Sequence, residues 1–425
     1  MTEQSQVRHK SLVEDTGKRV PDAKRKLLSN LGISLISILL ALLVAEVVVR
    51  TSIETDRDGQ QYFMGQPLRP FKPTIVQTRR TIDKYLESST SYIVYDPYTG
   101  WALRPSSQSK NGLYRANSAG IRADVEYSLE PDSGVVRIAL FGDSHTHCSK
   151  AKIEDSWGYQ LERLLRDQGY QVEVINFGVG GYAMDQAYLR WQHLGASYSP
   201  DIVIFGFRAE NAMRNLNVFR SIYHRSAGVP FSKPRFILDH GELQLVNSPT
   251  VPPEEIITTL ETLDQSPLAE YDTFYDEFYE ERWWLKSKLL AVLAGIIRPG
   301  IIEGGDAKRF SESYRMDGEA SQVAIAIIEA FETDVRSRGA EFLIVNLPND
   351  NDVANLIDGK EVIYADLLHY LDSTYHVVHP DELAGPSDVD RFGGHYGPGG
   401  NAIVARALLP EVVELIENSQ SDSSG

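Results

Sequence analysis

Four clusters of small polar residues along the chain contain the groups that nucleophilic acyl transfer needs. They are Gly142-Asp143-Ser144, the Gly-rich stretch 176–181, Asn211, and His395 in a second Gly-rich stretch. A serine hydroxyl needs a base such as histidine to become a nucleophile, and the oxyanion that forms on attack needs N–H donors. The residue types therefore predict a nucleophile, a general base and an oxyanion hole.

The elements that must position these clusters are apolar runs of strand length. Such runs at 135–141, 172–175 and 202–205 end directly before the first three clusters, and a short one at 376–378 precedes the fourth. Runs of this kind are typical of buried parallel strands, and open α/β sheets bind ligands beyond the carboxyl ends of their strands. We therefore expect the four clusters to meet at one edge of a sheet.

Each cluster also has a simpler interpretation when it is taken alone. Asp143 or Ser144 could cap the following helix, Asn211 could form a turn, and a single histidine such as His395 is most often a surface or core residue. The Gly-rich stretch 176–181 has neither the spacing nor the place after a first strand that a dinucleotide loop requires, so we expect no nucleotide cofactor. The prediction depends on the combination of the clusters and on their order.

Together these blocks resemble the SGNH, or GDSL-type, hydrolase superfamily. The resemblance covers roughly residues 130–215 and 318–418, and the apolar segment near the N-terminus and the aromatic stretch after it resemble those of membrane-attached bacterial members. It implies an α/β fold, a flavodoxin-like three-layer α/β/α sandwich with a parallel sheet. It also implies Ser144 as nucleophile, His395 as general base, and an oxyanion hole made by the backbone N–H groups of Ser144 and Gly181 and the side chain of Asn211. No metal and no other cofactor is required.

The sequence departs from the family pattern at two places. The acid that orients the histidine usually lies two or three residues before it, where this chain has Phe392 and Gly393. Asp390, or alternatively Asp388, is the candidate acid, and a Ser-His dyad that uses a backbone carbonyl is equally open. Ala212 follows the oxyanion asparagine where an aspartate is common.

Two further histidines flank the nucleophile. His145 and His147, with the single cysteine Cys148, form a His-x-His pair that could ligate a metal. Without a recognisable third ligand we favour residues that line the pocket, and either histidine could instead compete with His395 as base.

The N-terminal region predicts a membrane anchor. Residues 1–26 form a basic tail, 27–50 are almost continuously aliphatic with Glu46 near the far end, and acids follow soon after. This length crosses a bilayer, and the charge distribution puts the N-terminus in the cytoplasm and the catalytic domain outside, in the periplasm or at the cell surface. A cleaved signal peptide and a buried core helix are the alternatives.

The rest of the 425-residue chain divides into regions by composition. We expect a turn-rich stalk and collar at 51–129, the hydrolase-like domain at 130–418, and a disordered tail at 419–425. An insertion at 216–317 contains a hairpin centred on residues 239–241 and an apolar helix at 283–296. That helix is expected as a cap over the active site or, as the second alternative, on the membrane surface.

The sequence predicts a membrane-anchored extracytoplasmic serine esterase that removes O-acyl groups, above all O-acetyl groups, from an envelope glycan. The formal net charge of −17 argues against nucleic acid as a partner. An O-acyltransferase to glycan hydroxyls, a lysophospholipase and a non-catalytic glycan-binding or assembly protein remain as alternatives. The partners are the membrane, through residues 27–50, and an acylated glycan or lipid substrate.

Overall fold

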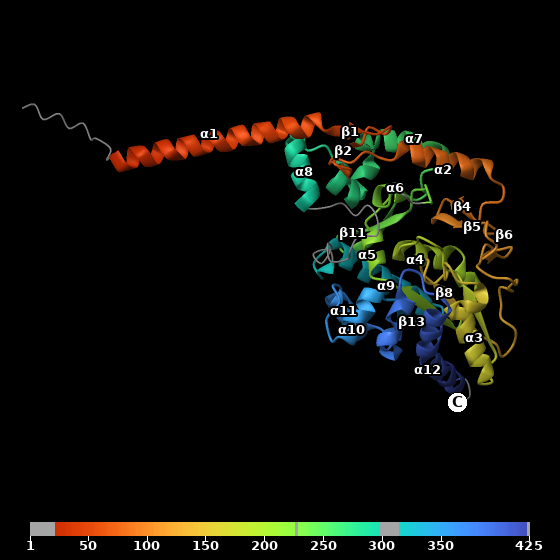
Figure 1. The fold of residues 1–425 in the computed structure, drawn as a ribbon. Coiled ribbons are helices and arrows are strands. Elements are labelled where there is room, and N and C mark those ends of the chain that lie inside the picture. The colour runs from red at the N-terminus through yellow and green to blue at the C-terminus, as the bar shows by residue number, and fades with distance from the viewer. Residues whose placement is uncertain (1–21, 226–227, 298–313, 423–425) are drawn as a thin grey trace, which may run out of the picture.

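The computed structural model describes residues 22–225, 228–297 and 314–422, and its centre is a parallel sheet (Figure 1). The strands are β8 (Val136–Phe141), β9 (Val172–Asn176), β10 (Ile202–Phe207), β13 (Glu341–Asn346) and β14 (Val377–Val378). Their spatial order is β9-β8-β10-β13-β14, with every neighbouring pair parallel. This is the 2-1-3-4-5 order of flavodoxin-like folds. The predicted parallel sheet is confirmed.

Alternate side chains of each strand enter two different cores. In β8, Ile138 and Leu140 belong to one buried cluster, whereas Ala139 and Phe141 belong to the other. Because the side chains of a strand point alternately to the two faces of its sheet, both faces must be covered by other elements. The continuous apolar character of this strand follows from that double burial.

Helices cover both faces of the sheet and complete the three layers. On one face lie α3 (Trp157–Asp167) and α12 (Pro398–Asp422), and on the other lie α4 (Met184–His193) and α9 (Glu319–Ser337). The shorter helices α10 (Asp350–Ile357) and α11 (Ala365–Thr374) lie near them (Figure 1). Helix α12 continues through Pro410 to Asp422, so the prediction of disorder is wrong for 419–422, and 423–425 lie outside the described residues.

The first helix, α1 (Asp22–Thr51), projects away from the rest of the molecule (Figure 1). Its segment Ser29–Thr51 is long and apolar enough to cross a membrane, and only 6% of its most apolar window is buried. The alternative of a buried core helix is therefore wrong. The basic tail that the sequence predicts lies mostly outside the described residues, which begin at 22.

The collar consists of a small three-stranded antiparallel sheet, two antiparallel strand pairs and one helix that the sequence analysis missed, α2 (Ile75–Glu87). The strands are β1 (Ile53–Thr55), β2 (Gln61–Phe63), β3 (Gln66–Pro67), β4 (Ile93–Asp96), β5 (Gly100–Leu103), β6 (Ser107–Gln108) and β7 (Arg115–Ala116). Trp101 of β5 is fully buried, and its indole N–H donates to the carbonyl of Gly180 at 3.0 Å. The collar is thereby fixed against the Gly-rich loop after β9.

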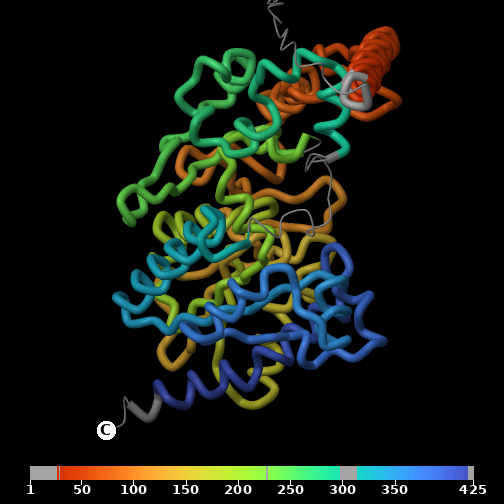
Figure 2. The backbone as a smooth tube through the Cα atoms, turned by 90° about the vertical axis from the view of Figure 1, so that its left-hand side faces the viewer, coloured from red at the N-terminus to blue at the C-terminus, as the bar shows by residue number. Residues whose placement is uncertain are grey.

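Helix α5 (Glu210–Arg214) follows β10, and the insertion after it contains α6 (Arg220–Tyr223), β11 (Arg235–Asp239), β12 (Glu242–Val246), α7 (Pro253–Glu261) and α8 (Lys288–Ile297). The predicted hairpin is confirmed, and its turn residues His240 and Gly241 both have positive φ, as a type I′ turn requires. Helix α8 was expected first as a cap over the active site. It packs beside α1 instead, away from the carboxyl edge of the sheet (Figures 1 and 2).

Candidate active site

The predicted nucleophile lies on a sharp turn at the end of β8. Gly142 has φ of +154°, and a Cβ atom there would lie 2.3 Å from Oγ1 of Thr146. Only glycine fits this position without a shift of Thr146, since such an approach is far inside van der Waals contact. Ser144 follows two residues later and is partly exposed, so its hydroxyl is accessible at the carboxyl edge of the sheet.

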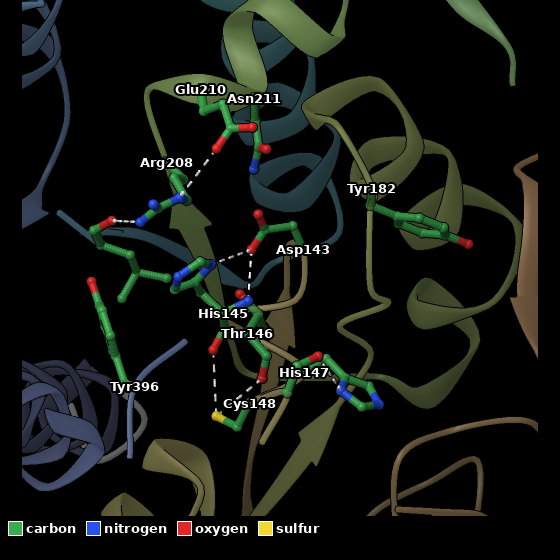
Figure 3. A network of polar contacts seen from close by, with 12 residues as sticks. Asp143, His145, Thr146, His147, Cys148, Tyr182, Arg208, Glu210, Asn211 and Tyr396 are labelled. Carbon is green, nitrogen blue, oxygen red and sulfur yellow. Dashed lines mark hydrogen bonds and ion pairs between the residues drawn. The ribbon is translucent and has the colours of Figure 1, made fainter. Parts of the chain in front are cut away.

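Asp143 stabilises this turn from its buried side. Its carboxylate is buried, accepts the backbone N–H of His145 at 2.8 Å, and pairs with Arg214 at 3.2 Å. Burial alone would raise the pKa of Asp143, but His145, Arg214 and Arg208 outweigh it and hold that pKa well below its usual range. The carboxylate therefore stays charged and connects the nucleophile turn to Arg214, and Figure 3 shows its contacts with His145.

His145 connects the nucleophile turn to the loop that carries His395. Its Nε2 lies 2.9 Å from the carbonyl oxygen of Gly394, so Nε2 carries a proton and donates it. Its Nδ1 lies 3.5 Å from the carboxylate of Asp143. The His145 and His395 rings stack, with centroids 5.0 Å apart and an interplanar angle of 25°. Residues separated by about 250 positions are thereby brought together, and His395 lies against the neighbour of Ser144.

His395 is available as a base at neutral pH. Its side chain is partly buried, and burial together with the adjacent His145 lowers its pKa to about 4, against a smaller opposing effect of Asp143. A histidine with this pKa is neutral at pH 7 and can accept a proton. Within the described part of the chain, no carboxylate forms a hydrogen bond or ion pair with this imidazole.

The two aspartates that the sequence offers as the orienting acid are engaged elsewhere or exposed. Asp388 accepts the backbone N–H of Gly385 at 3.0 Å and pairs with Arg391 at 3.2 Å. Asp390 is exposed, and neither carboxylate contacts His395 through a hydrogen bond. The structure therefore brings neither aspartate to His395, whose ring stacks instead on His145, and His145 donates to the carbonyl of Gly394.

The Gly-rich loop after β9 packs closely against the nucleophile turn. A Cβ atom at Gly178 would lie 2.5 Å from the backbone nitrogen of His147, so a larger residue cannot occupy this position. Asn176 donates to the carbonyl of Thr146 at 2.7 Å and also accepts the N–H of Gly178. These contacts fix the loop that contains Gly181, whose φ is +83°.

Asn211 is buried, and its amide has a defined orientation. Its Oδ1 accepts a hydrogen bond from Arg214 at 2.9 Å, and since arginine is only a donor, the amide nitrogen must point the other way. In the described chain, that nitrogen and the backbone N–H groups of Ser144 and Gly181 have no protein acceptor. Three donors are therefore free to bind an oxyanion.

Arg214 is a site residue that the sequence analysis missed. It is positioned one turn after Asn211 on α5, and its guanidinium contacts Asp143, Asn211 and Glu210 at 3.2, 2.9 and 2.8 Å. The i,i+3 and i,i+4 spacing to two acceptors on one helix was a signal that could have identified it. Burial opposes the charge of Glu210, but Arg214 and Arg208 lower the pKa of Glu210 to about 2, so the cluster stays ionised.

A further guanidinium, that of Arg220, is next to the same loop. A Cβ atom on Gly181 would lie 3.9–4.0 Å from its Nε and Nη2 atoms. Burial and the nearby Arg214 lower the pKa of Arg220 to about 10, which still leaves it charged at neutral pH. Among the described residues its guanidinium forms no ion pair with a carboxylate, although Glu210 and Asp143 are close enough to act on its charge, and the ring centroid of Tyr223 lies 5.1 Å from it. The site therefore holds a guanidinium that has no direct ion-pair partner in the described chain.

His147 and Cys148 point into the protein. His147 hydrogen-bonds Tyr92 of the collar through Nε2 at 2.9 Å and Ser149 through Nδ1 at 3.3 Å. Burial, and secondly Arg122, hold the pKa of His147 well below its usual value, and burial raises that of the Cys148 thiol to about 12. Among the described residues no group of three or more His, Cys, Asp or Glu side chains is arranged to hold a metal ion. His147 is thus part of the wall of the site.

No family model and no curated protein sequence matches the chain. Solved structures of similar fold include a putative lipolytic protein of the G-D-S-L family from Desulfitobacterium hafniense, with 13% identity, coverage of 65% of this chain and 98% of the other, and a TM-score of 0.32. A lipase/acylhydrolase from Enterococcus faecalis has 12% identity, coverage of 65% of this chain and 95% of the other, and a TM-score of 0.32. A carbohydrate acetylesterase family member from Sinorhizobium meliloti has 14% identity, coverage of 66% of this chain and 99% of the other, and a TM-score of 0.25.

These are proteins of the class that the sequence resembles. Because the identities and TM-scores are low, the likeness carries no argument about activity, and the interpretation of the site depends on the side chains of this chain.

Proposed function

We propose that this protein is a membrane-anchored, extracytoplasmic serine esterase of SGNH type that removes O-acyl groups, O-acetyl groups in particular, from an envelope glycan. The observation that carries the proposal is the contact between two distant segments. The His145–Gly394 hydrogen bond and the stacked imidazoles hold His395 beside the turn that presents Ser144.

The reaction begins with attack of the Ser144 hydroxyl on the ester carbonyl. His395, neutral at pH 7, takes the hydroxyl proton as the Oγ–C bond forms. The carbonyl oxygen becomes an oxyanion, which the free N–H groups of Ser144, Gly181 and Asn211 are proposed to bind. Removal of one such donor costs about 2.7–4 kcal/mol of transition-state stabilisation in comparable sites.

Collapse of the tetrahedral intermediate breaks the bond to the alcohol oxygen, and the His395 imidazolium returns its proton to that oxygen. The acyl group stays on Ser144. A water molecule then attacks the acyl-enzyme while His395 again accepts a proton, which releases the carboxylic acid and restores the serine. A glycan hydroxyl that entered in place of water would make the protein an acyltransferase by the same steps.

Arg220 favours a substrate with a negative charge close to the acyl group. Its guanidinium lies beside the proposed oxyanion loop and forms no ion pair with a carboxylate in the described chain. A guanidinium binds a carboxylate or phosphate through two parallel hydrogen bonds. An acidic glycan, such as one that contains uronic acid or phosphate groups, meets this requirement.

The anchoring part of the proposal is based on α1. The outer surface of this helix is apolar along Ser29–Thr51, and its last turns are bonded to α8, because Glu46 accepts the backbone N–H groups of Lys288 and Leu289 at 2.9 and 2.7 Å. Cleavage of the segment as a signal peptide would remove these contacts. Basic residues before the segment support a cytoplasmic N-terminus.

The test is hydrolysis of a short-chain p-nitrophenyl ester and of an O-acetylated acidic polysaccharide by the full chain in lipid nanodiscs. Ser144→Ala and His395→Ala are expected to lose turnover on both substrates. Ser133→Ala and His369→Ala change exposed residues of the same types and serve as matched controls that should keep it.

The products separate the alternatives. Free acetate supports the esterase, and acetyl transfer to an added oligosaccharide identifies an acyltransferase. Turnover that survives Ser144→Ala, or an inactive wild-type protein that still binds the polysaccharide, would overturn the proposed mechanism.

A further inference from the structure

Helix α8 is separated from the sheet and lies beside the end of α1. Its buried residue Ala291 packs with Leu285 and Leu68 in a small apolar cluster of its own. Figures 1 and 2, which differ by a quarter turn, both show α8 running across the axis of α1. The two helices therefore form a corner at the junction between the projecting helix and the rest of the molecule.

A polar clamp centred on Glu46 fixes this corner. The Glu46 carboxylate accepts hydrogen bonds from Ser287 at 2.8 Å and from the backbone N–H groups of Lys288 and Leu289 at 2.9 and 2.7 Å. These N–H groups are in the first turn of α8, where they have no partner inside the helix. A carboxylate there also interacts favourably with the helix dipole.

Arg50 adds the second half of the clamp. Its Nε donates to Glu46 at 2.6 Å, and its Nη2 donates to the carbonyl of Lys286 at 2.7 Å. The acid in the otherwise aliphatic segment of α1 is thus occupied in holding α8. This arrangement fixes the direction of α8 relative to α1.

The face of α8 that points away from the protein is apolar. Leu290, Leu293 and Ile296 follow one another at helical spacing, and their exposed fractions are 43%, 41% and 68%. Trp283, in the turn before the helix, is 81% exposed, and Lys286 beside it is exposed as well. A leucine and isoleucine face flanked by tryptophan and lysine is the pattern of helices that lie in a membrane interface.

We infer that α8, together with Trp283, is a second membrane contact and lies in the headgroup region of the bilayer that α1 crosses. The inference assumes the proposed membrane anchoring by α1. Since α8 runs across α1, a bilayer crossed by α1 has its surface along α8, and the exposed apolar face is continuous with the apolar surface of α1. The partner of this face is lipid.

The clamp then fixes the orientation of the catalytic domain. A single spanning helix with a flexible stalk would let the domain tilt freely. A spanning helix and an interfacial helix joined by Glu46 and Arg50 leave one orientation, so the edge of the sheet that carries Ser144 is held at a constant distance from the membrane. The protein would then bind substrate in the layer of the envelope that lies at this distance from the membrane.

The experiment places an environment-sensitive fluorophore at single cysteines of the full chain in a Cys148→Ser background, in liposomes with and without brominated lipids. Leu293→Cys reports on α8, Leu39→Cys on α1, and Leu383→Cys, an exposed leucine in the hydrolase-like domain, is the matched control. The expected result is a blue shift and loss of emission with brominated lipid at positions 293 and 39, and neither change at position 383. Glu46→Ala, which removes the clamp, should reduce the quenching at 293 but not at 39.

The outcomes separate this inference from the proposed anchoring. Quenching at 39 without quenching at 293 overturns the inference and leaves the anchor intact, whereas no quenching at 39 overturns the anchor. A blue shift at 293 that brominated lipid does not quench would mean that protein, for example a second copy of the chain, covers the face, and this also overturns the inference. Because the readout does not require turnover, it can be repeated in Ser144→Ala.

Discussion

The substitution His145→Phe tests how the general base is positioned. Phenylalanine keeps a ring that can stack on His395 but removes the Nε2–H donor to Gly394. A hydrogen bond of this kind contributes about 0.5–1.5 kcal/mol. If the bond is made only in the productive position of the loop, kcat should fall roughly 2- to 10-fold, with the protein still folded.

The same substitution should move the pH dependence in a defined direction. In the wild-type protein the pKa of His395 is about 4, lowered by burial and by His145. A base works in its neutral form, so the acid limb of kcat/KM is expected near pH 4, and at pH 5.5 about 97% of His395 is neutral, against about 9% for an ordinary histidine of pKa 6.5. Removal of the His145 contribution raises the pKa, while burial keeps it below 6.5.

The assay is a pH series of aryl ester hydrolysis from pH 3.5 to about 8, the range in which histidine titrates, with His369→Phe on the exposed surface of α11 as control. His145→Phe should show an acid limb at higher pH and a lower plateau. An unchanged limb and plateau would refute the positioning role. Loss of all activity in His145→Phe, together with activity in His395→Phe, would mean that His145 is the base.

Three more substitutions have defined outcomes. Asn211→Ala should lower kcat of ester hydrolysis by about 100- to 1,000-fold with little change in KM, because one oxyanion donor is lost; a fall below 10-fold would exclude that role. Gly206→Ala should destabilise the protein by about 1–3 kcal/mol in urea unfolding, because its Cβ would lie 2.3 Å from Oγ1 of Thr146, and Thr146→Ala in the same chain should recover part of the loss. Arg220→Met should lower kcat/KM for an acidic acetylated glycan but not for a neutral aryl ester; equal losses would remove the argument for an anionic substrate.

The strands of the sheet could be predicted because their sequences are shaped by burial on both faces. The apolar runs before Ser144 and before Asn211 correspond to β8 and β10 within one or two residues. The chain order of these runs, with helical patterns between them, leads directly to a parallel sheet. The turn residues that follow the strands were therefore placed at the correct edge.

The elements that were missed have weaker local patterns. Helix α2 lies among turn signals, and its side chains are mostly exposed, with only Thr78 and Ile82 buried. Arg214 resembles an ordinary surface residue in the sequence, since its role depends on Asp143, which is 71 residues away. The hydrogen bond from His145 to Gly394 could not be predicted from any local sequence pattern. The spacing of residues indicates neither that these two residues pair nor which way the imidazole points.

The cap was predicted wrongly for a related reason. The apolar residues of 283–296 indicate that the helix must cover or enter something apolar, but not which surface this is. The Glu46 clamp decides it, and Glu46 is about 240 residues away from the residues that it binds, Ser287 and Lys288. In the same way, the exposed side chain of Asp390 shows that proximity in sequence to His395 does not place a carboxylate beside the ring.

The central claim is that Ser144 is a nucleophile activated by His395. The most direct measurement is covalent labelling of the full chain by a fluorophosphonate, with the modified residue located by mass spectrometry. We expect one label, on Ser144, with a labelling rate that falls sharply in His395→Ala and stays unchanged in His369→Ala. A label on another residue, or labelling of Ser144 at the same rate without His395, would contradict the mechanism.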